Sequence, residues 1–270
     1  MIDFSIITVN YNGVEGLGKT IHSVISQNYR NYEYIVIDGG STDGSKQLIE
    51  QNRKNITFWC SETDNGIYNA MNKGISHATG DYLLFLNGGD VFHSYTVLSE
   101  VKSHLDGTDI ISGYALKDNH TYLNIHEENV LMMLLHSTFS HQATFIRREL
   151  FDNYKYDEHL KIVSDWEAWI DWIIIRNHTY KYIDTIVSDY DFSGISSDSS
   201  NWGEILSERQ YVLSSHFPAK VVDNLMKCND FYLKTHYKYI DSNPYLKQLA
   251  YAILKSIAFF GKLINKKSIS

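Results

Sequence analysis

Asp90 is the residue whose place in the sequence most directly suggests chemistry. It follows the apolar run 82–86 and the turn Asn87–Gly88–Gly89. The carboxyl end of such a strand is where open α/β sheets bind ligands. No Lys or Arg lies beside Asp90 in the sequence to neutralise its charge. Carboxylate oxygens suit Mg²⁺ and Mn²⁺, so the sequence predicts that Asp90 binds a divalent metal.

Two further acids have positions with a defined chemical use. Asp38 directly follows the apolar run 35–37 and begins the turn DGGSTDGS, where it could accept hydrogen bonds from a ribose or a base, or cap a helix. In KIVSDWEAW, Ser164 and Glu167 match the S-x-x-E capping box. Asp165 is therefore expected in the first turn of a helix, where the helix dipole keeps a carboxylate ionised.

Strand and helix alternate through the first hundred residues. Apolar runs predict four strands, at 4–9, 34–37, 56–59 and 82–86. Helical stripes between them imply a parallel sheet with right-handed crossovers. The polar loops that follow the strands should therefore converge at one edge, and these loops are 9–12, 38–43, 61–66 and 87–90. Beyond Asp90, a helix near 96–105 and a strand near 109–114 predict an α+β half that continues the sheet.

Composition limits the class of protein. The 270 residues are 43% hydrophobic, enough for a large domain with a real core. The 24 basic and 32 acidic residues give a net charge of −8, which argues against a nucleic-acid partner. Cys60 and Cys228 have no metal-type spacing, and no secretory signal is readable at the N-terminus. We therefore expect a cytoplasmic protein.

The sequence from Tyr245 to Lys267 differs from the rest of the chain. It carries five lysines and no acid, and its apolar residues recur at helical spacing. A basic amphipathic helix of this kind is typical of contact with a membrane surface. A terminal helix that packs on its own domain would have the same apolar stripe, so both interpretations stay open.

Five separated motifs resemble the family 2 glycosyltransferases of the GT-A fold, especially bacterial enzymes that build O-antigen, capsule and exopolysaccharide. They are FSIITVNYN, VIDGGSTDGS, SETDNGIYNAMNKGISHATGDYLLFLNGGD, HQATFIRRELF and KIVSDWEAW, in this order between residues 4 and 195. The resemblance implies an α/β GT-A fold with a Rossmann-like mixed sheet flanked by helices. It implies a catalytic domain over 1–200, made of a nucleotide-sugar-binding half (1–95) and an acceptor-binding half (96–200). A helical C-terminal extension would cover 201–270.

The resemblance also assigns roles to individual residues. Asp165 matches the catalytic base, with Glu167 as the competing acid. Asp90 matches the final acid of the DxD metal motif, whereas Gly88 stands where the first acid would be. The acceptor side would include His141, Gln142 and Trp166, although a structural role for His141 is equally open. The segment 193–196 would close over the donor. The residues that resemble the nucleotide-sugar site are Val9, Asn10, Tyr11, Asp38, Asp64, Gly66, Met71, Lys73 and Gly89.

These roles predict an inverting transfer from a nucleotide-diphosphate sugar, with UDP the leading nucleotide, aided by Mn²⁺ or Mg²⁺. The acceptor would be a saccharide on a polyprenyl diphosphate lipid at the cytoplasmic face of the membrane, contacted through 245–270. A nucleotidyltransferase is an alternative, but it would normally bring a basic phosphate loop where this chain has NYNGVEGLG. A catalytically weak sugar- or nucleotide-binding protein is another, suggested by Gly88. A glycoside hydrolase would have no use for the motifs at Asp38 and Asp64.

Overall fold

The computed structural model describes residues 2–117, 121–122, 129–191, 194 and 198–227. Its contacts separate the chain into two compact units, residues 1–216 and 217–270. In the second unit the described residues 219–227 are helical. The predicted basic helix at 245–267 lies outside the described residues, and the functional division predicted at residues 95 and 200 stays a prediction.

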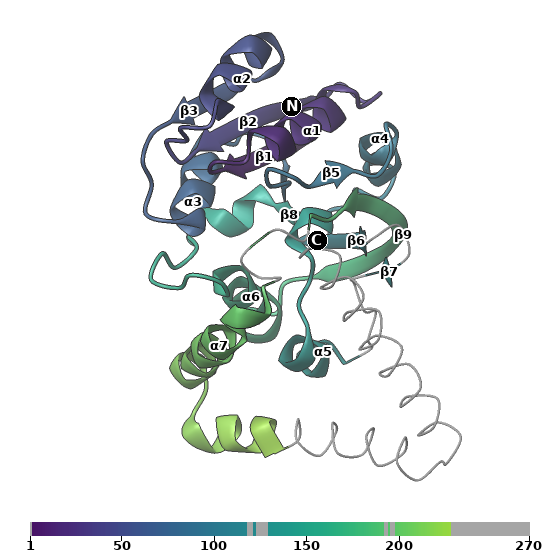
Figure 1. Ribbon diagram of the computed structural model, residues 1–270. Coiled ribbons are helices and arrows are strands. Elements are labelled where there is room, and N and C mark those ends of the chain that lie inside the picture. The colour runs from purple at the N-terminus through teal and green to yellow at the C-terminus, as the bar shows by residue number, and fades with distance from the viewer. Residues whose placement is uncertain (1, 118–120, 123–128, 192–193, 195–197, 228–270) are drawn as a thin grey trace, which may run out of the picture. The chain divides into compact units, whose positions relative to one another are not determined.

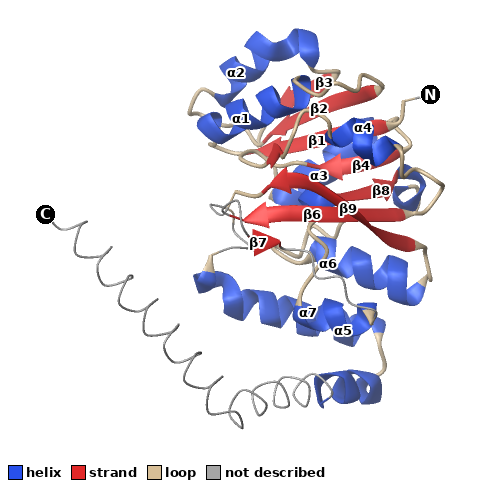
Figure 2. Cartoon of the chain, turned by 90° about the vertical axis from the view of Figure 1, so that its right-hand side faces the viewer, coloured by secondary structure: helices blue, strands red, loops and turns tan. Residues whose placement is uncertain are grey.

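A mixed β-sheet forms the centre of the first unit. Its strands lie in the order β3-β2-β1-β4-β8-β6-β9-β5, and β7 pairs with β6 (Figure 2). The strands are β1 (Phe4–Asn10), β2 (Tyr32–Asp38), β3 (Phe58–Ser61), β4 (Tyr82–Phe85), β5 (Val91–Phe92), β6 (Ile110–Lys117), β7 (Thr121–Tyr122), β8 (Thr144–Arg147) and β9 (Tyr180–Asp189). The four strands expected in the first hundred residues are present, with the third displaced by two residues toward the C-terminus.

The strand directions bring the predicted loops to one edge of the sheet. β1 pairs in parallel with β2 and β4, and β2 pairs in parallel with β3. β8 is antiparallel to both β4 and β6, so β6 has the same direction as β4, and β9 is parallel to β6. The carboxyl ends of β1, β2, β4 and β9 therefore lie at the same edge, as expected for β1, β2 and β4.

Helices cover both faces of this sheet. α1 turns its apolar side, Leu17, Ile21 and Val24, into a core that includes Ile6. α3 lies on the opposite face (Figure 1). It approaches the sheet so closely that a Cβ at Gly74 would lie 2.5 Å from Ile7 Cγ2. Ile6 and Ile7 are successive residues and so face opposite ways. The α-helices are α1 (Val14–Ile25), α2 (Ser45–Asn52), α3 (Ile67–His77), α4 (Val97–Lys102), α5 (Val130–His136), α6 (Ser164–Trp169) and α7 (Trp202–His216).

Asp165 lies in the first turn of α6 as predicted, but the helix already begins at Ser164 and the predicted capping box is wrong. The Ser164 hydroxyl accepts a hydrogen bond from the backbone N–H of Asp157, and Glu167 pairs with His216 instead of reaching back to the helix start. The helix continues into a π-helical turn, Ile170–Ile175. Trp169 and Trp172 are fully buried in the core. Among the described residues, no helix is both long and apolar enough to cross a membrane.

Candidate active site

Asp38 lies at the end of β2, fully buried, and its carboxylate organises the loop that follows. Asn10 Nδ2 and Ser41 Oγ donate to Asp38 Oδ1 at 2.9 and 2.6 Å. The backbone N–H of Ser41 and the hydroxyl of Ser61 donate to Oδ2 at 3.0 and 2.7 Å. Burial alone would raise the pKa of Asp38, but these hydrogen bonds outweigh it and lower the pKa. The Asp38 carboxylate thus already accepts hydrogen bonds within the protein, and its contact with a nucleotide stays a prediction.

Two predicted nucleotide-site residues lie beside Asp38 and remain accessible. A Cβ on Gly39 would lie 2.6 Å from Asp64 Oδ2 and 3.2 Å from the Tyr11 ring, so both side chains flank the Asp38–Gly39 turn. Tyr11 is 70% exposed. Asp64 Oδ1 accepts from the N–H of Gly66, which has φ +112° and precedes α3. An exposed ring beside a polar turn is suited to stack on a base.

The remaining predicted nucleotide-site residues have structural partners. Val9 and Met71 are buried in the core, and Asn10 is held by Asp38. Lys73 Nζ pairs with Glu62 at 2.8 Å, at the rim of the loop that carries Asp64. Their direct contact with a donor stays a prediction.

Asp90 is held by a tightly packed turn. The Thr20 hydroxyl of α1 accepts from the N–H of Gly89 at 2.9 Å and donates to the carbonyl of Asp90 at 2.8 Å. Gly89 has φ +111°, which side chains other than glycine rarely adopt. A Cβ on Gly88 would lie 2.7 Å from Asn10 Oδ1. Close packing on both sides therefore fixes the backbone that presents the Asp90 carboxylate.

The structure brings a second acid to Asp90. Asp90 is 3% exposed, and its Oδ1 accepts from the backbone N–H of Asp191, just beyond β9, at 2.9 Å. Burial raises the pKa of Asp90 to about 6, and the negative charge of Asp191 adds to the rise. A Cβ on Gly89 would lie 2.3 Å from Asp191 Oδ2, so the two carboxylates approach the same turn. Two carboxylates of this kind would fit a divalent cation, which lowers the cost of keeping a buried acid ionised. No group of three or more His, Cys, Asp and Glu residues forms a metal cage within the described part of the chain.

Asp165 lies in the first turn of α6 and is held from two sides. The Tyr68 hydroxyl donates to Asp165 Oδ1 at 2.8 Å, and His141 Nδ1 lies 3.3 Å from Oδ2. Burial pushes the pKa of Asp165 up, but the hydrogen bond and charge of His141, with the hydrogen bond of Tyr68, lower it overall. Burial pushes the pKa of His141 down, and the contact with Asp165 raises it overall. Both directions favour an ionised Asp165 beside a protonated His141.

His141 connects Asp165 to the turn that carries Asp90. Its Nε2 lies 3.1 Å from Asn87 Nδ2, three residues before Asp90, and the charge of Asp90 also acts on its ring. Asn87 Oδ1 is buried without a hydrogen bond in this orientation. A half-turn of the amide would present Oδ1 to the Nε2–H of a protonated His141. His141 therefore lies between Asp165 and the turn 87–90, and its ring is near enough to Asp90 for the two charges to interact.

The predicted acceptor residues differ in their positions. His141 lies between the two acids. Gln142 is buried in the same short helical turn, and its contact with an acceptor stays a prediction. Trp166 is 2% exposed, donates its indole N–H to the carbonyl of Leu134 at 2.7 Å, and has the Arg209 guanidinium 4.9 Å from its ring centroid. A role for Trp166 in stacking on a sugar does not fit this position. The predicted mobile segment 193–196 lies outside the described residues except for Gly194.

Sequence reasoning missed Thr20, Tyr68 and Asp191. Thr20 interrupts the apolar side of α1 with a buried hydroxyl, which is a readable signal for a polar contact. Tyr68 lies on the buried side of α3 among apolar neighbours, where a phenol needs a partner. Nothing in the local sequence of Asp191 indicates that it meets Asp90.

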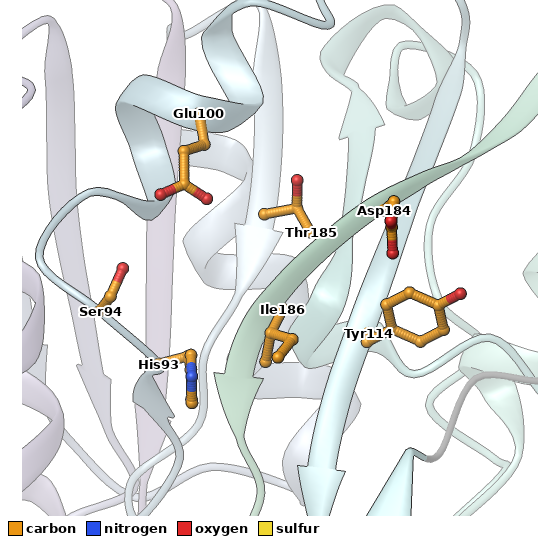
Figure 3. Close-up of a pocket in the computed structure, with 7 residues that line it drawn as sticks. All are labelled: His93, Ser94, Glu100, Tyr114, Asp184, Thr185 and Ile186. Atoms are coloured by element: carbon orange, nitrogen blue, oxygen red, sulfur yellow. The ribbon is translucent and has the colours of Figure 1, made fainter.

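A separate cavity of about 510 Å³ lies between β5, α4, β6 and β9 (Figure 3). His93, Glu100, Tyr114 and Thr185 are among its lining residues. None of the sequence-predicted site residues lines it, so we assign the site to the cluster around Asp90 and Asp165.

The family described as Glycosyl transferase family 2 matches residues 5–158. An uncharacterized glycosyltransferase of Mycobacterium tuberculosis is 41% identical over 109 residues, which are 40% of this chain and 42% of that protein. A PGL/p-HBAD biosynthesis glycosyltransferase of Mycobacterium bovis is 27% identical over 202 residues, covering 72% of this chain and 79% of that protein. The chain thus spans less than half the length of the first of these relatives.

Solved structures share the fold at low sequence identity. S. aureus TarS 1–349 in complex with UDP-GlcNAc has a TM-score of 0.63 at 18% identity, covering 89% of this chain and 74% of that chain. The mannosyltransferase PcManGT from Pyrobaculum calidifontis, in complex with GDP-Man and Mn²⁺, has a TM-score of 0.59 at 17% identity. The match covers 82% of this chain and 64% of that chain. The predicted α/β GT-A fold class is confirmed.

Proposed function

This chain belongs to glycosyl transferase family 2, and we propose that it moves a hexose or N-acetylhexosamine from a nucleotide-diphosphate sugar to a saccharide hydroxyl. The observation that carries the proposal is the link between Asp90 and Asp165 through Asn87 and His141. An acid suited to a metal and an acid suited to a proton lie at the two ends of one polar cluster. The proposed inverting transfer uses the base at the attacking hydroxyl and the cation at the departing diphosphate.

The proposed reaction is a single in-line displacement. The acceptor oxygen forms a bond to the anomeric carbon while the bond from that carbon to the diphosphate oxygen breaks, and its electron pair leaves with the nucleotide diphosphate. The hydroxyl proton passes to Asp165, which His141 and Tyr68 keep ionised and oriented. One displacement inverts the configuration at the anomeric carbon.

Asp90 and Asp191 are the residues that would hold the divalent cation, with water and the donor diphosphate as further ligands. The cation would supply positive charge to the departing diphosphate. Mn²⁺ and Mg²⁺ both fit oxygen ligands, and PcManGT was solved with Mn²⁺.

UDP is the nucleotide we propose. S. aureus TarS 1–349, which shares the fold, was solved in complex with UDP and with UDP-GlcNAc. In this chain the exposed Tyr11 ring and the Asp64 carboxylate flank the turn after Asp38, where a uracil and its ribose could lie. GDP-sugars are the main competitors, since PcManGT was solved with GDP-Man.

For the acceptor we propose a saccharide on a polyprenyl diphosphate lipid, used to build a bacterial surface polysaccharide such as O-antigen or capsule. Support comes from the basic amphipathic sequence 245–267 and from the relative named for PGL/p-HBAD biosynthesis. The protein would then work at the cytoplasmic face of the membrane. Deletion of residues 245–270 should release it from membrane fractions, and unchanged fractionation would refute the membrane contact.

A panel of nucleotide sugars tests the transfer itself. Each donor is added with and without Mn²⁺, and thermal stabilisation identifies those that bind the folded state. With the best donor, the wild type should release the nucleoside diphosphate in the presence of acceptor. Asp165→Asn should lose transfer while keeping donor stabilisation, whereas equal loss of donor binding would contradict the assigned role. Release of pyrophosphate from UTP and a sugar phosphate would favour the nucleotidyltransferase alternative.

A further inference from the structure

The turn that leads to Asp165 has an external cap. The backbone N–H groups of three successive residues before α6 donate to one carboxylate, that of Glu208 on α7. Lys161 donates to Oε1 at 2.7 Å, and Ile162 and Val163 donate to Oε2 at 3.0 and 3.2 Å. The predicted capping box at Ser164 does not form, and Glu208, more than forty positions away, accepts from the N–H of the N-cap residue Val163 and from those of the two residues before it.

A carboxylate is well suited to this place. Hydrogen bonds to an ionised acceptor are stronger than those between neutral groups. The N-terminal end of a helix also carries partial positive charge, which favours an anion there. Glu208 therefore fixes the path of residues 161–163 more firmly than solvent would.

The same turn is held from its other side by α3. The Tyr68 hydroxyl, which donates to Asp165 Oδ1, also lies 2.7 Å from the carbonyl oxygen of Ile162. Ile162 thus contacts Glu208 through its N–H and Tyr68 through its carbonyl. Asp165 lies three residues after Ile162 and contacts the same Tyr68 hydroxyl.

Helix α7 makes further contacts with α6 along its length. The Arg209 guanidinium lies over the Trp166 ring and donates to the carbonyl of Ser137 at 3.2 Å. His216 Nε2 lies 3.0 Å from Glu167 Oε1. These contacts place α7 against the helix that carries the proposed base, within the first compact unit.

We propose that Glu208 is a positioning residue for Asp165. This proposal rests on the proposed function only because it takes Asp165 to be the base. Glu208 contacts no reacting atom. It holds the turn 161–163 so that the Asp165 carboxylate meets both Tyr68 and His141.

The test compares Glu208→Ala with Glu204→Ala. Glu204 lies one helical turn away on α7 and pairs with the exposed Nζ of Lys161 at 2.7 Å, so its loss removes a charge near the same turn but no backbone cap. Misplacement of a reacting group by about 1 Å can cost about 100-fold, so we expect kcat of Glu208→Ala to fall by about 10- to 100-fold with donor KM nearly unchanged. The kcat of Glu204→Ala should stay within about 2-fold of the wild-type value, because exposed ion pairs contribute little. Glu208→Gln keeps one acceptor oxygen and should give an intermediate kcat.

Hydrogen exchange supplies a readout independent of turnover. The amides of residues 161–163 should exchange faster in Glu208→Ala than in the wild type or in Glu204→Ala, at a temperature where all three proteins are folded. Wild-type kcat in Glu208→Ala, or an equal fall in both alanine variants, would overturn the proposal. A fall in kcat without faster exchange at 161–163 would also overturn it. If the wild type transfers no sugar from any donor, the proposed function fails, and the exchange data separately decide whether Glu208 holds the turn.

Discussion

Replacing Asp165 by Asn should lower the pKa of His141. In the wild type, burial pushes that pKa down, but the hydrogen bond and charge of Asp165 raise it above its ordinary value. Asparagine is close to aspartate in size and removes the negative charge. Burial of the imidazole and the charge of Asp90 would both remain, so the pKa of His141 should fall relative to the wild type by the contribution of Asp165.

The size of the shift follows from the single contact that is lost. His141 Nδ1 lies 3.3 Å from Asp165 Oδ2, and both side chains are largely buried. A hydrogen bond between charged groups contributes about 1.5–3 kcal/mol, and one pKa unit corresponds to about 1.4 kcal/mol, so the fall should be about 1–2 units.

NMR titration of the histidine ring protons measures this shift directly. The chain has 12 histidines, so the His141 signal is assigned by its absence in His141→Gln. His178 is a matched control, because its Nδ1 lies 3.3 Å from Asp109 Oδ2, and its signals should be the same in both proteins. An unchanged or higher pKa of His141 in Asp165→Asn would refute the ion pair, and with it our account of how the base stays ionised.

The pair should also contribute to stability in a defined pH window. Because the folded pKa of Asp165 is lowered, its contribution is present above the unfolded value of about 3.9 and is lost as pH falls through the folded value. Because the folded pKa of His141 is raised, its contribution is present below the unfolded value of about 6.5 and is lost as pH rises through the folded value. The difference in unfolding free energy between wild type and Asp165→Asn should therefore be largest between about pH 4 and 6.5.

Two further predictions concern the turn at Asp90. Asp90→Asn should abolish the extra thermal stabilisation that Mn²⁺ adds to a bound donor, and a wild-type Mn²⁺ response in this variant would count against Asp90 as a ligand. Because burial raises the pKa of Asp90 to about 6, the Mn²⁺ effect in the wild type should decline as pH falls through that value. In urea unfolding, Gly89→Ala should lower the free energy of unfolding by about 1–3 kcal/mol more than Gly107→Ala does. Both glycines have positive φ, but of the two only Gly89 would place the new methyl against another residue, 2.3 Å from Asp191 Oδ2. Equal destabilisation would mean that Asp191 moves aside without cost.

Local patterns were enough to predict the arrangement of the first half. Apolar runs followed by polar turns placed Asp38 and Asp90 at the ends of β2 and β4, and parallel pairing brought those ends together. The motif around Asp165 correctly placed this acid in the first turn of α6. These features depend on hydrophobic periodicity and on residues close in sequence, which is why they could be read.

The predictions that failed, and the contact that was missed, concern segments that are distant in the sequence. The capping box at Ser164 and Glu167 is locally favourable, yet in the structure Val163 N–H pairs with Glu208 and Glu167 pairs with His216, both on α7. The acceptor-side role predicted for Trp166 would need an accessible ring, whereas Leu134 of α5 and Arg209 of α7 contact it in the core. Asp191 meets Asp90 only because β9 ends at the same edge of the sheet.

Packing at Asn10 leaves little room for a side chain at residue 88, where the family resemblance would place the first acid of a DxD motif. Asn10 occupies the space that a side chain at residue 88 would enter, and its amide is simultaneously committed to Asp38. An engineer who wished to restore the motif by Gly88→Asp would have to shorten Asn10 as well, and the loop after β2 would then lose one of its anchors. The turn after β4 and the loop after β2 are in this way coupled through Asn10, so a side chain at residue 88 requires a change at residue 10.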